Sequence, residues 1–430
     1  MHNELLKRIY NACDPRQPAS EAYYLDCGIA RGSGGLTDAF IREIRNANDK
    51  LCFLLSGHLG CGKSSELAQL CRALKSGTSL GVRYFHVIVN ASDYIDDYDV
   101  AATDILLAII TELAATMRAE GRELKDIWLT TRVRESAEIL FSDVELKEVE
   151  LFKTKFQLLK RDPGARQKVR KALKPMLGGI VYEVNNVFED ARTQLKQLSS
   201  CYQDFVIIVD NLEKIQRVGE KDVRLVSQRE LFIENSRHLT GLNAHLVYTL
   251  PLRVARQAAG QLDAYGPLHV LPMIKIEERS GHSPYPAGLD CLRNLLQKRL
   301  GDVSVNEFFA PDALNFLLTY SGGHVRNFMS VVQRAVAYAD GIPIPLDAAQ
   351  RALQQTIRNA SAGISKRQWE LLAALEQSRD QQIDASDTDY LQILENLAIF
   401  EYINGSGVTD ILTSNRPWYA VNPILRKQWP

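Results

Sequence analysis

The sequence lacks several features that mark particular classes of protein. Its 430 residues carry 51 Lys and Arg against 52 Asp and Glu, a net charge of −1. No global basic field therefore favours nucleic acid or an anionic membrane, although a local patch stays open. Its seven cysteines contain no C-x-x-C pair, which argues against a zinc site or a disulfide framework. No apolar run approaches 18 residues and the first ten residues have no signal-like core, so we expect a cytoplasmic protein without membrane contact.

Short apolar runs alternate with segments of helical periodicity over much of the chain. We expect buried strands at residues 51–55, 82–89, 205–209, 245–250 and 270–276. Helices are expected at residues 36–49, 63–76, 99–120 and 223–239. Alternating strands and helices predict a parallel sheet, and uninterrupted apolar runs predict strands buried on both faces. The predicted fold class is α/β.

Other stretches have helical periodicity or a mixed pattern. Residues 121–200 are highly charged with few helix breakers, so we expect a helical insertion. Helices near 369–375 and 389–397 precede strands near 399–403 and 418–421, which is the order of a winged helix. The expected domains are 1–120 and 201–283 for the two parts of the α/β core, 121–200 for the insertion, 284–360 for a helical lid and 361–430 for a winged-helix-like domain.

Residues 57–64 have the sequence Gly-His-Leu-Gly-Cys-Gly-Lys-Ser, which matches the pattern G-x-x-x-x-G-K-[ST] in full. They also follow an expected strand and begin an expected helix, which is the context that this pattern requires. Glycines let backbone N–H groups turn toward an anion, and the helix N-terminus adds partial positive charge. The segment is typical of the phosphate-binding loop, or Walker A motif, of a P-loop NTPase.

Residues of this loop have different expected roles. The Lys63 ammonium is expected to bind the β- and γ-phosphates of ATP, and the Ser64 hydroxyl to bind Mg²⁺. His58 and Cys61 occupy variable positions of the pattern, and we assign them no catalytic role. The expected nucleotide-binding set is Gly57, His58, Leu59, Gly60, Cys61, Gly62, Lys63, Ser64 and Ser65. ATP and Mg²⁺ are the expected cofactors.

An acidic residue, Asp210, follows the apolar run 205–209. A carboxylate at the C-terminal end of a parallel strand faces the phosphates across the sheet edge, so we expect Asp210 to hold Mg²⁺ as a Walker B acid. The alternative is that it only caps a turn. The next residue, Asn211, cannot accept a proton, which makes Glu213 the candidate base for the attacking water. Hydrolysis then depends on Glu213 or is slow, and slow hydrolysis suits a switch better than a motor.

The segment Asp-Asn-Leu-Glu-Lys at 210–214 resembles the extended Walker B motif of STAND and KAP-like NTPases, in which a second acid follows the first by three residues. Ser-Gly-Gly-His-Val-Arg-Asn at 321–327 resembles the sensor-2 helix of origin-recognition-type AAA+ proteins. Thr249 resembles a polar sensor at the end of a neighbouring strand. The resemblance covers about residues 36–110, 204–276 and 284–430.

This resemblance implies a P-loop NTPase sheet with a helical insertion, a helical lid and a C-terminal winged helix. In it, Thr249 and Arg326 contact the γ-phosphate region. Thr249 could instead be a strand-end hydroxyl bound to the backbone, and Arg326 an ordinary surface arginine. An arginine offered to a neighbouring subunit is expected before the strand of Thr249, where Arg237 is best placed and Arg229 second; either could lie on a solvated helix face. Arg31 is a candidate to lie beside the adenine.

A basic run at residues 160–174 has seven Lys and Arg in fifteen positions. It could bind nucleic acid or an acidic protein surface, but without aromatic residues a solvated amphipathic helix is favoured. Residues 365–430 contain six basic and nine acidic residues, a net charge of −3. DNA-groove binding by this domain is therefore not favoured, and we expect it to pack against the ATPase core or another protein.

These features predict an ATP-binding, slowly hydrolysing AAA+/STAND-like switch that assembles as a homo-oligomer when it binds nucleotide. The resemblance to bacterial STAND-like ATPases makes anti-phage defence, beside a separate effector protein, the expected setting. The alternative is a DNA-binding AAA+ initiator or transposition-type regulator, motivated by the basic run and the winged helix. A third hypothesis is a scaffold that holds ATP without hydrolysis, motivated by Asn211.

Overall fold

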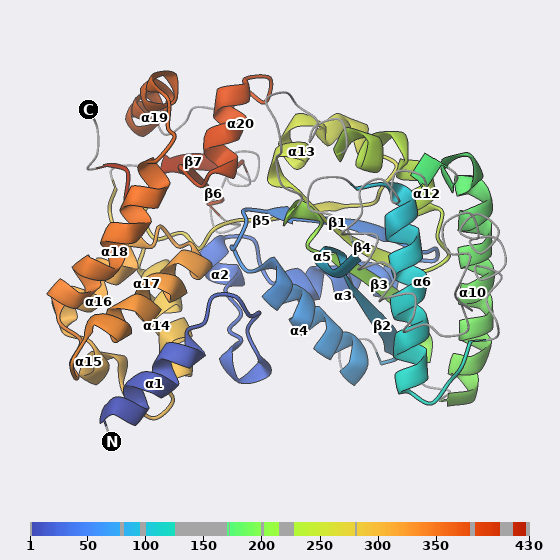
Figure 1. Cartoon of the computed structure of the whole chain (residues 1–430), viewed down its shortest axis with the longest axis horizontal. Coiled ribbons are helices and arrows are strands. Elements are labelled where there is room, and N and C mark those ends of the chain that lie inside the picture. Colours follow the sequence, from blue (N-terminus) through green and yellow to red (C-terminus); the bar gives the residue numbers. More distant parts are fainter. Residues whose placement is uncertain are drawn as a thin grey trace, which may run out of the picture. The chain divides into compact units, whose positions relative to one another are not determined.

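The computed structural model divides the chain into two compact units (Figure 1). The sheet unit comprises Phe40–Ser56 and Leu70–His269, and the lid unit comprises Met1–Ala39, Gly57–Gln69 and Val270–Pro430. The structure describes residues 2–77, 81–94, 100–124, 170–171, 173–198, 202–214, 228–279, 282–378, 383–404 and 416–426. Within these ranges no helix is both long enough and apolar enough to cross a bilayer. The six cysteines that they include are all buried free thiols.

A five-stranded parallel sheet forms the core of the sheet unit (Figure 1). Its strands are β1 (Cys52–Gly57), β2 (Arg83–Asn90), β3 (Tyr202–Asp210), β4 (His245–Leu250) and β5 (Leu268–Leu271). Their order is β2-β3-β4-β1-β5, and the pairs β1–β4, β3–β4 and β2–β3 are parallel. β1 and β4 are buried along their whole length, as expected of strands covered on both faces. The predicted α/β class with a parallel sheet is confirmed.

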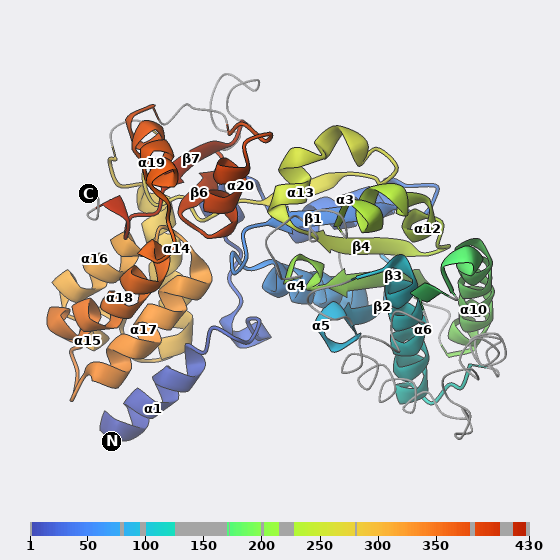
Figure 2. The same ribbon diagram turned by 45° about the horizontal axis from the view of Figure 1, so that its top comes forward.

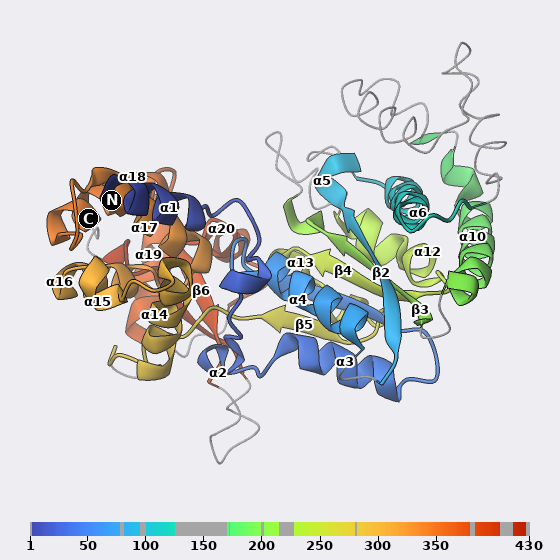
Figure 3. The same cartoon turned by 90° about the horizontal axis from the view of Figure 1, so that it is seen from below.

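Helix α3 (Leu36–Asn46) precedes β1, and the other helices lie between strands of this sheet. They are α4 (Lys63–Ser76), α5 (Ala91–Tyr94), α6 (Ala102–Ala119), α10 (Leu177–Leu198), α12 (Ser236–Thr240) and α13 (Leu252–Gln257). Helices α6 and α10 lie side by side in all three views (Figures 1, 2 and 3). Their apolar faces join β2 and β3 in one core, in which the Phe205 ring centre lies 5.6 Å from that of Phe85 and 6.2 Å from that of Phe188.

The prediction of a strand over residues 270–276 is wrong beyond Leu271. Pro272 has no N–H to donate to a neighbouring strand, so it ends β5. The Met273 N–H instead donates to the Glu401 carbonyl, and the Lys275 N–H to the Ala30 carbonyl, each at 3.0 Å. The segment therefore ties three distant parts of the lid unit together.

Two predicted helical stretches are only partly described. The helix predicted at 223–239 is interrupted, because a π-helical turn at Glu230–Glu234 precedes α12; residues 223–227 lie outside the described residues. In the predicted insertion at 121–200, α10 confirms helical structure, and residues 125–169 lie outside the described residues.

The lid unit is mainly helical. Its helices before residue 365 are α1 (His2–Ala12), α2 (Gly28–Arg31), α14 (Pro286–Leu300), α15 (Val305–Phe308), α16 (Pro311–Tyr320), α17 (Val325–Tyr338) and α18 (Leu346–Ser361). Helix α1 packs against α14 and α17. Two side chains fix it there: Arg8 donates to the Leu300 carbonyl and Gln333 donates to the Tyr10 carbonyl, each at 2.9 Å. The predicted helical character of 284–360 is confirmed.

We call residues 366–426 the C-terminal module. It contains α19 (Lys366–Ser378), α20 (Thr388–Glu395) and the antiparallel strands β6 (Ile399–Tyr402) and β7 (Trp418–Val421). Tyr402 lies opposite Trp418, and their ring centres are 4.8 Å apart. These helices and strands occur where the sequence predicts them, and their assignment as a winged helix stays a prediction.

A buried ionic cluster stabilises the start of β3 in the sheet unit. Asp204, which is 5% exposed, accepts hydrogen bonds from Lys50 and from Arg192 Nε, the latter at 2.9 Å. Burial raises the pKa of Asp204, but the hydrogen bonds from Lys50 and Phe205 N–H and the charges of Arg192 and Lys50 outweigh it and lower the pKa. The ionised carboxylate thus stabilises the fold above its unfolded pKa, and this contribution is lost as the pH falls through the folded pKa.

We expect Asp204→Asn to lower the free energy of unfolding by about 3 kcal/mol, because Arg192 and Lys50 lose their buried counter-charge. Glu230→Gln is the matched control, since Glu230 forms an exposed pair with Lys174 in the same unit. That control should cost less than about 0.5 kcal/mol. Denaturant unfolding followed by circular dichroism measures both, and equal losses would contradict a stabilising role for the cluster.

Candidate nucleotide-binding site

The loop between β1 and α4 has a backbone that requires its glycines. Gly57, Gly60 and Gly62 have φ angles of 142°, 86° and 117°, which side chains rarely permit. Gly60 is also crowded, because a Cβ there would lie 2.8 Å from His324 Cε1 and 2.9 Å from Arg326 Cβ. Helix α4 begins directly after the loop, so the loop leads into a helix N-terminus with its partial positive charge.

Lys63 binds the loop from within. It is 3% exposed, and its ammonium donates to the carbonyl oxygens of Gly57 and His58, each at 3.0 Å. An ammonium offers three donors that can rotate among nearby acceptors. Lys63 can therefore exchange these loop carbonyls for phosphate oxygens.

His324 joins the start of α17 to the same loop. Its Nδ1 accepts from the Asn327 N–H at 3.0 Å, and its Nε2 lies 2.8 Å from the Leu59 carbonyl oxygen. Because Nδ1 accepts, the neutral ring carries its proton on Nε2 and donates it to Leu59. Burial lowers the pKa of His324 to about 4, against the opposing effect of the bond to Leu59. The ring is therefore neutral at neutral pH and serves at once as helix cap and as clamp on the loop.

Arg326, two residues after His324, also contacts the loop. Its backbone N–H donates to the Gly60 carbonyl at 3.2 Å. The preceding turn that makes this possible uses Gly322 and Gly323, with φ angles of 59° and 71°. A Cβ at position 323 would overlap the Ile274 carbonyl. The structure thus brings Arg326 to the phosphate loop, and its contact with a γ-phosphate stays a prediction.

Arg31 supplies a further anchor from the N-terminal part of the chain. It ends α2, is 3% exposed, and donates from Nη2 to the Cys61 carbonyl at 2.7 Å and from Nη1 to the Pro272 carbonyl. Its guanidinium adds a buried positive charge next to the loop. The structure therefore gives Arg31 a supporting role, and its placement beside the adenine stays a prediction.

Five consecutive carbonyls, those of residues 57–61, are thus held by protein donors from Arg31, Lys63, His324 and Arg326. The C=O and N–H of a trans peptide point in opposite directions. The carbonyls of residues 59–61 are held from outside the loop by His324, Arg326 and Arg31, which turns the N–H groups of the same peptides the other way; one of these, that of Cys61, closes the turn onto the His58 carbonyl. Backbone N–H groups gathered in this way form an anion-binding nest.

The segment before α2 supports the first turn of α4. Ser65 Oγ accepts from the Ala19 N–H at 2.9 Å, and the Tyr24 hydroxyl donates to Glu66 Oε2 at 3.0 Å. Burial raises the pKa of Glu66, although the charge of Arg31 and the hydrogen bond from Tyr24 act against it. Ser65 is therefore engaged with the N-terminal segment; both Ser64 and Ser65 are partly exposed.

In the sheet unit, Asp210 is the last residue of β3, and it is 7% exposed. Burial raises the pKa of Cys71 on α4 to about 12, and the charge of Asp210 adds to that shift. Asn211 follows in a left-handed conformation with φ of 68°. Its Nδ2 donates to Asn90 Oδ1 at the end of β2, at 2.8 Å. The amide thus joins the ends of two neighbouring strands.

Thr249, fully buried in β4, binds the backbone beside Asp210. Its Oγ1 accepts from the Leu212 N–H at 3.0 Å and donates to the Val209 carbonyl at 3.4 Å. This contact matches the alternative in which Thr249 is a strand-end hydroxyl bound to the backbone. Its sensor role stays a prediction.

The other sequence candidates lie on short helices of the sheet unit. Glu213 is half-buried in the 3-10 turn Leu212–Lys214, three residues after Asp210. Arg237 is exposed on α12, and Arg229 is exposed immediately before the π-helical turn. An exposed arginine is open to a second subunit, and the structure does not test that role.

The described part of the basic run is engaged in ion pairs within the sheet unit. Arg170 binds Asp104 on α6 at 2.5 Å, and Lys174 binds Glu230 at 2.6 Å. Residues 160–169 lie outside the described residues. Lys171, also described, is exposed. The choice between a solvated amphipathic helix and a run that binds nucleic acid or an acidic protein surface therefore stays a prediction.

The residues expected to hold Mg²⁺ suit that ion. Mg²⁺ takes oxygen ligands, keeps several waters, and is commonly bound through one or two carboxylates and the phosphates of its substrate. A hydroxyl from Ser64 and a carboxylate from Asp210 fit this description. In the ranges that the structure describes, no three His, Cys, Asp or Glu side chains are grouped so as to hold a metal by themselves.

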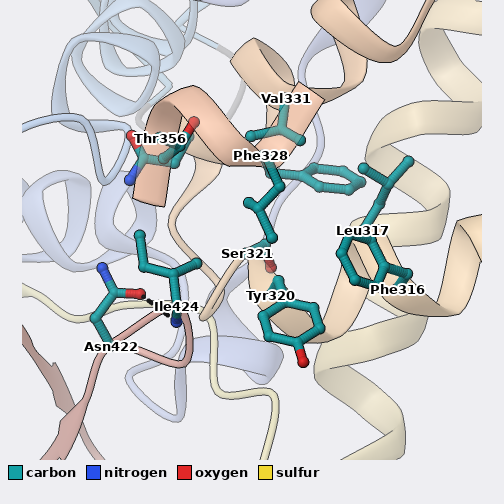
Figure 4. Close-up of a pocket in the computed structure, with 11 residues that line it drawn as sticks. Phe316, Leu317, Tyr320, Ser321, Phe328, Val331, Thr356, Asn422 and Ile424 are labelled. Atoms are coloured by element: carbon teal, nitrogen blue, oxygen red, sulfur yellow. Dashed lines mark hydrogen bonds between the residues drawn. The ribbon is translucent and has the colours of Figure 1, made fainter. Parts of the chain in front are cut away.

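A separate pocket in the lid unit lies between α16, α17, α18 and residues 422–424 (Figure 4). Phe316, Tyr320, Phe328 and Val331 make it mainly apolar, and Asn422 Oδ1 at its rim accepts from the Ile424 N–H at 3.3 Å. No charged side chain lines it. It does not have the chemistry of a phosphate site.

Sequence reasoning found the loop and Arg326 but missed His58 and His324 as supporting residues. His58 Nε2 accepts from the Glu401 N–H at 3.0 Å, a partner 343 positions away. The segment 321–327 contained a usable signal for His324, because an N-cap residue must stand between the glycine pair and the helix. No comparable local signal exists for His58.

No protein-family model and no curated protein matches this sequence. Among solved structures, the ORC2 protein of Aeropyrum pernix in ADPNP–ADP complexes is similar with a TM-score of 0.39 and 14% identity, over 97% of this chain and 93% of that chain. Drosophila ORC bound to GC-rich DNA and Cdc6 has a TM-score of 0.30 and 12% identity, over 89% of this chain and 53% of that chain. Likenesses at this level do not bear on function, which must be inferred from the residues of the site.

The buried, neutral His324 predicts that the lid unit loses stability as the pH becomes acidic. Its unfolded pKa of about 6.5 exceeds the folded value, so the unfolded state binds more protons between these two values. Its contribution is fully present above pH 6.5 and falls by about 3 kcal/mol as the pH drops to 4. His324→Asn keeps a good N-cap and should flatten the decline in stability over this range, as measured by thermal unfolding at several pH values. Identical pH profiles for the variant and the wild type would contradict it.

Proposed function

We propose that this chain binds Mg-ATP and works as a slow, nucleotide-driven switch. The observation that carries the proposal is the phosphate loop, whose five carbonyls are bound to protein donors while Lys63 lies inside it. Building such a nest requires several buried polar groups and glycines at positive φ. The arrangement has an evident use only if an anion as highly charged as a triphosphate binds there.

The proposed roles follow from the chemistry of each side chain. Lys63 binds the β- and γ-phosphates, and Ser64 and Asp210 hold Mg²⁺, which offsets the phosphate charge when it is bound. Thr249 and Arg326 are assigned to the γ-phosphate region. ATP and ADP differ only there, so a conformational response to ATP requires differential contacts at that position.

Slow hydrolysis is part of the proposal. The position directly after Asp210 holds an amide, and this amide is committed to Asn90 at the end of β2. Glu213 is then the residue assigned to orient and deprotonate the attacking water. In this site the candidate base stands three residues after Asp210 and not directly after it. Such a site suits a protein that stays in its ATP-bound state for a long time.

Assembly in the cytoplasm as a homo-oligomer completes the proposed switch. Arg237 is exposed on a short helix and can be offered to a neighbouring copy, where an arginine would stabilise charge on the transferring phosphoryl group. We extend this proposal to a role in anti-phage defence beside a separate effector protein. This extension rests on the resemblance alone.

We expect Lys63→Ala to weaken ATP binding at least tenfold, because it removes a charge-assisted donor from the phosphates. Lys75→Ala, an exposed change at the far end of the same helix, should leave affinity within about twofold. Titration with a fluorescent ATP analogue measures affinity, and light scattering with and without ATP–Mg²⁺ measures mass. Equal affinities in the two variants would contradict the proposed site; a wild-type mass indifferent to ATP would contradict assembly.

Glu213→Gln separates hydrolysis from binding. We expect turnover of ATP to fall by about 100-fold or more, because the amide cannot take the proton of the attacking water, while affinity for ATP changes by less than about twofold. Glu234→Gln, at an exposed position, serves as control. A phosphate-release assay gives the result. Unchanged turnover would place the base elsewhere, and a wild type that binds ATP without turnover would favour the scaffold hypothesis.

A further inference from the structure

Strand β6 of the C-terminal module contacts two other segments with three consecutive residues. These segments are the phosphate loop and the turn at residues 321–324 before α17, which we call the lid turn. The Phe400 ring centre lies 6.0 Å from that of His58, edge-on at 86°, and 5.8 Å from that of His324. The Glu401 N–H donates to His58 Nε2 at 3.0 Å. The Tyr402 hydroxyl donates to the Gly322 carbonyl at 2.7 Å. All of these residues are buried.

The fit between β6 and the lid turn is close. A Cβ at Gly322 would overlap the Phe400 ring, so the glycine before α17 is needed for β6 as well as for the turn. The Glu401 carbonyl accepts from the Met273 N–H at 3.0 Å. The N–H of Glu401 is thus hydrogen-bonded to the loop and its carbonyl to the segment that follows β5. These two bonds hold β6 in one register.

His58 is bound at both its side chain and its backbone. The ring accepts from Glu401, whereas the His58 carbonyl accepts from Lys63, at 3.0 Å in each case. Because Nε2 accepts a hydrogen bond, the contact with β6 requires a neutral ring with its proton on Nδ1. A residue at a variable position of the motif therefore links the C-terminal module to the lysine that the motif supplies for phosphate.

We propose that His58 is a positioning residue through which strand β6 sets the geometry of the phosphate loop, so that seating of the C-terminal module and nucleotide binding strengthen each other. The coupling to nucleotide binding rests on the proposed function. The sign of the coupling follows from the place of His58 in the loop. The contact with β6 fixes the His58 ring, and with it the peptide that leads into residues 59–61, whose carbonyls are anchored by groups outside the loop. Lys63 can leave the His58 carbonyl for phosphate without breaking this contact, so β6 favours the binding-competent loop. Reciprocity then requires that nucleotide also favour the seated β6.

Three variants of the full-length protein test this. His58→Leu keeps an apolar body but removes the acceptor. His58→Gln places a carbonyl oxygen near the former Nε2 and should restore the hydrogen bond. Tyr402→Phe loosens β6 from the other side, at the Gly322 carbonyl, without touching the loop. Circular dichroism spectra equal to that of the wild type establish that each variant folds.

Amide hydrogen exchange without nucleotide tests the contact itself. Peptides that cover β6 and β7 should exchange about tenfold faster in His58→Leu, because one buried hydrogen bond is lost, and at the wild-type rate in His58→Gln. Tyr402→Phe should accelerate them as well, and added ATP–Mg²⁺ should slow them in the wild type. Unchanged exchange in both His58→Leu and Tyr402→Phe would overturn the proposal.

Affinity for a fluorescent ATP analogue tests the coupling. We expect a five- to tenfold loss in His58→Leu, a smaller loss in Tyr402→Phe and recovery to within about twofold in His58→Gln, an effect of one hydrogen bond. Faster exchange with unchanged or tighter nucleotide binding would overturn the coupling. If the wild type bound no ATP, the proposed function and the coupling would fail together, and the exchange data alone would still decide whether His58 seats β6.

Discussion

The loop of residues 57–62 depends on hydrogen bonds to its carbonyl oxygens more than on any other interaction in the lid unit. A nest for an anion needs N–H groups that converge, and the peptide bond allows this only if the carbonyls find partners on the other side. Here the outside partners come from α2 and from the start of α17, and they hold the carbonyls of residues 59–61. The other two carbonyls, those of Gly57 and His58, are bound by Lys63 of the helix that the loop itself begins.

This dependence explains why residues with no part in the chemistry are buried and closely fitted. Arg31 and His324 hold main-chain oxygens of the loop, and β6 in turn holds the turn from which α17 starts. The buried guanidinium of Arg31 is costly to desolvate, and its two carbonyl partners repay only part of that cost. A nearby phosphate would complete its electrostatic environment.

The sequence was sufficient where structure is local and insufficient where it is not. The G-x-x-x-x-G-K-[ST] pattern lies within eight residues, and the apolar strands have a composition that burial on both faces demands, so both could be predicted. The contact between His58 and Glu401 joins two positions whose types reveal nothing alone. The end of β5 was predictable from Pro272. The apolar residues after it resemble a strand in sequence, but their backbone is hydrogen-bonded to Glu401 and Ala30 and not to a strand of the sheet. The hydrophobic pattern of a sequence indicates which residues are buried, but not which strand their backbone is hydrogen-bonded to.

Gly60 is not demanded by the phosphate-binding pattern, which leaves its position open. It is glycine here for two reasons: its φ of 86° suits few other residues, and a side chain would meet His324 and Arg326. A larger residue at this position would therefore have to change the turn of the loop and push back the start of α17 at the same time. One glycine thus lets the loop and the helix that caps it approach each other closely.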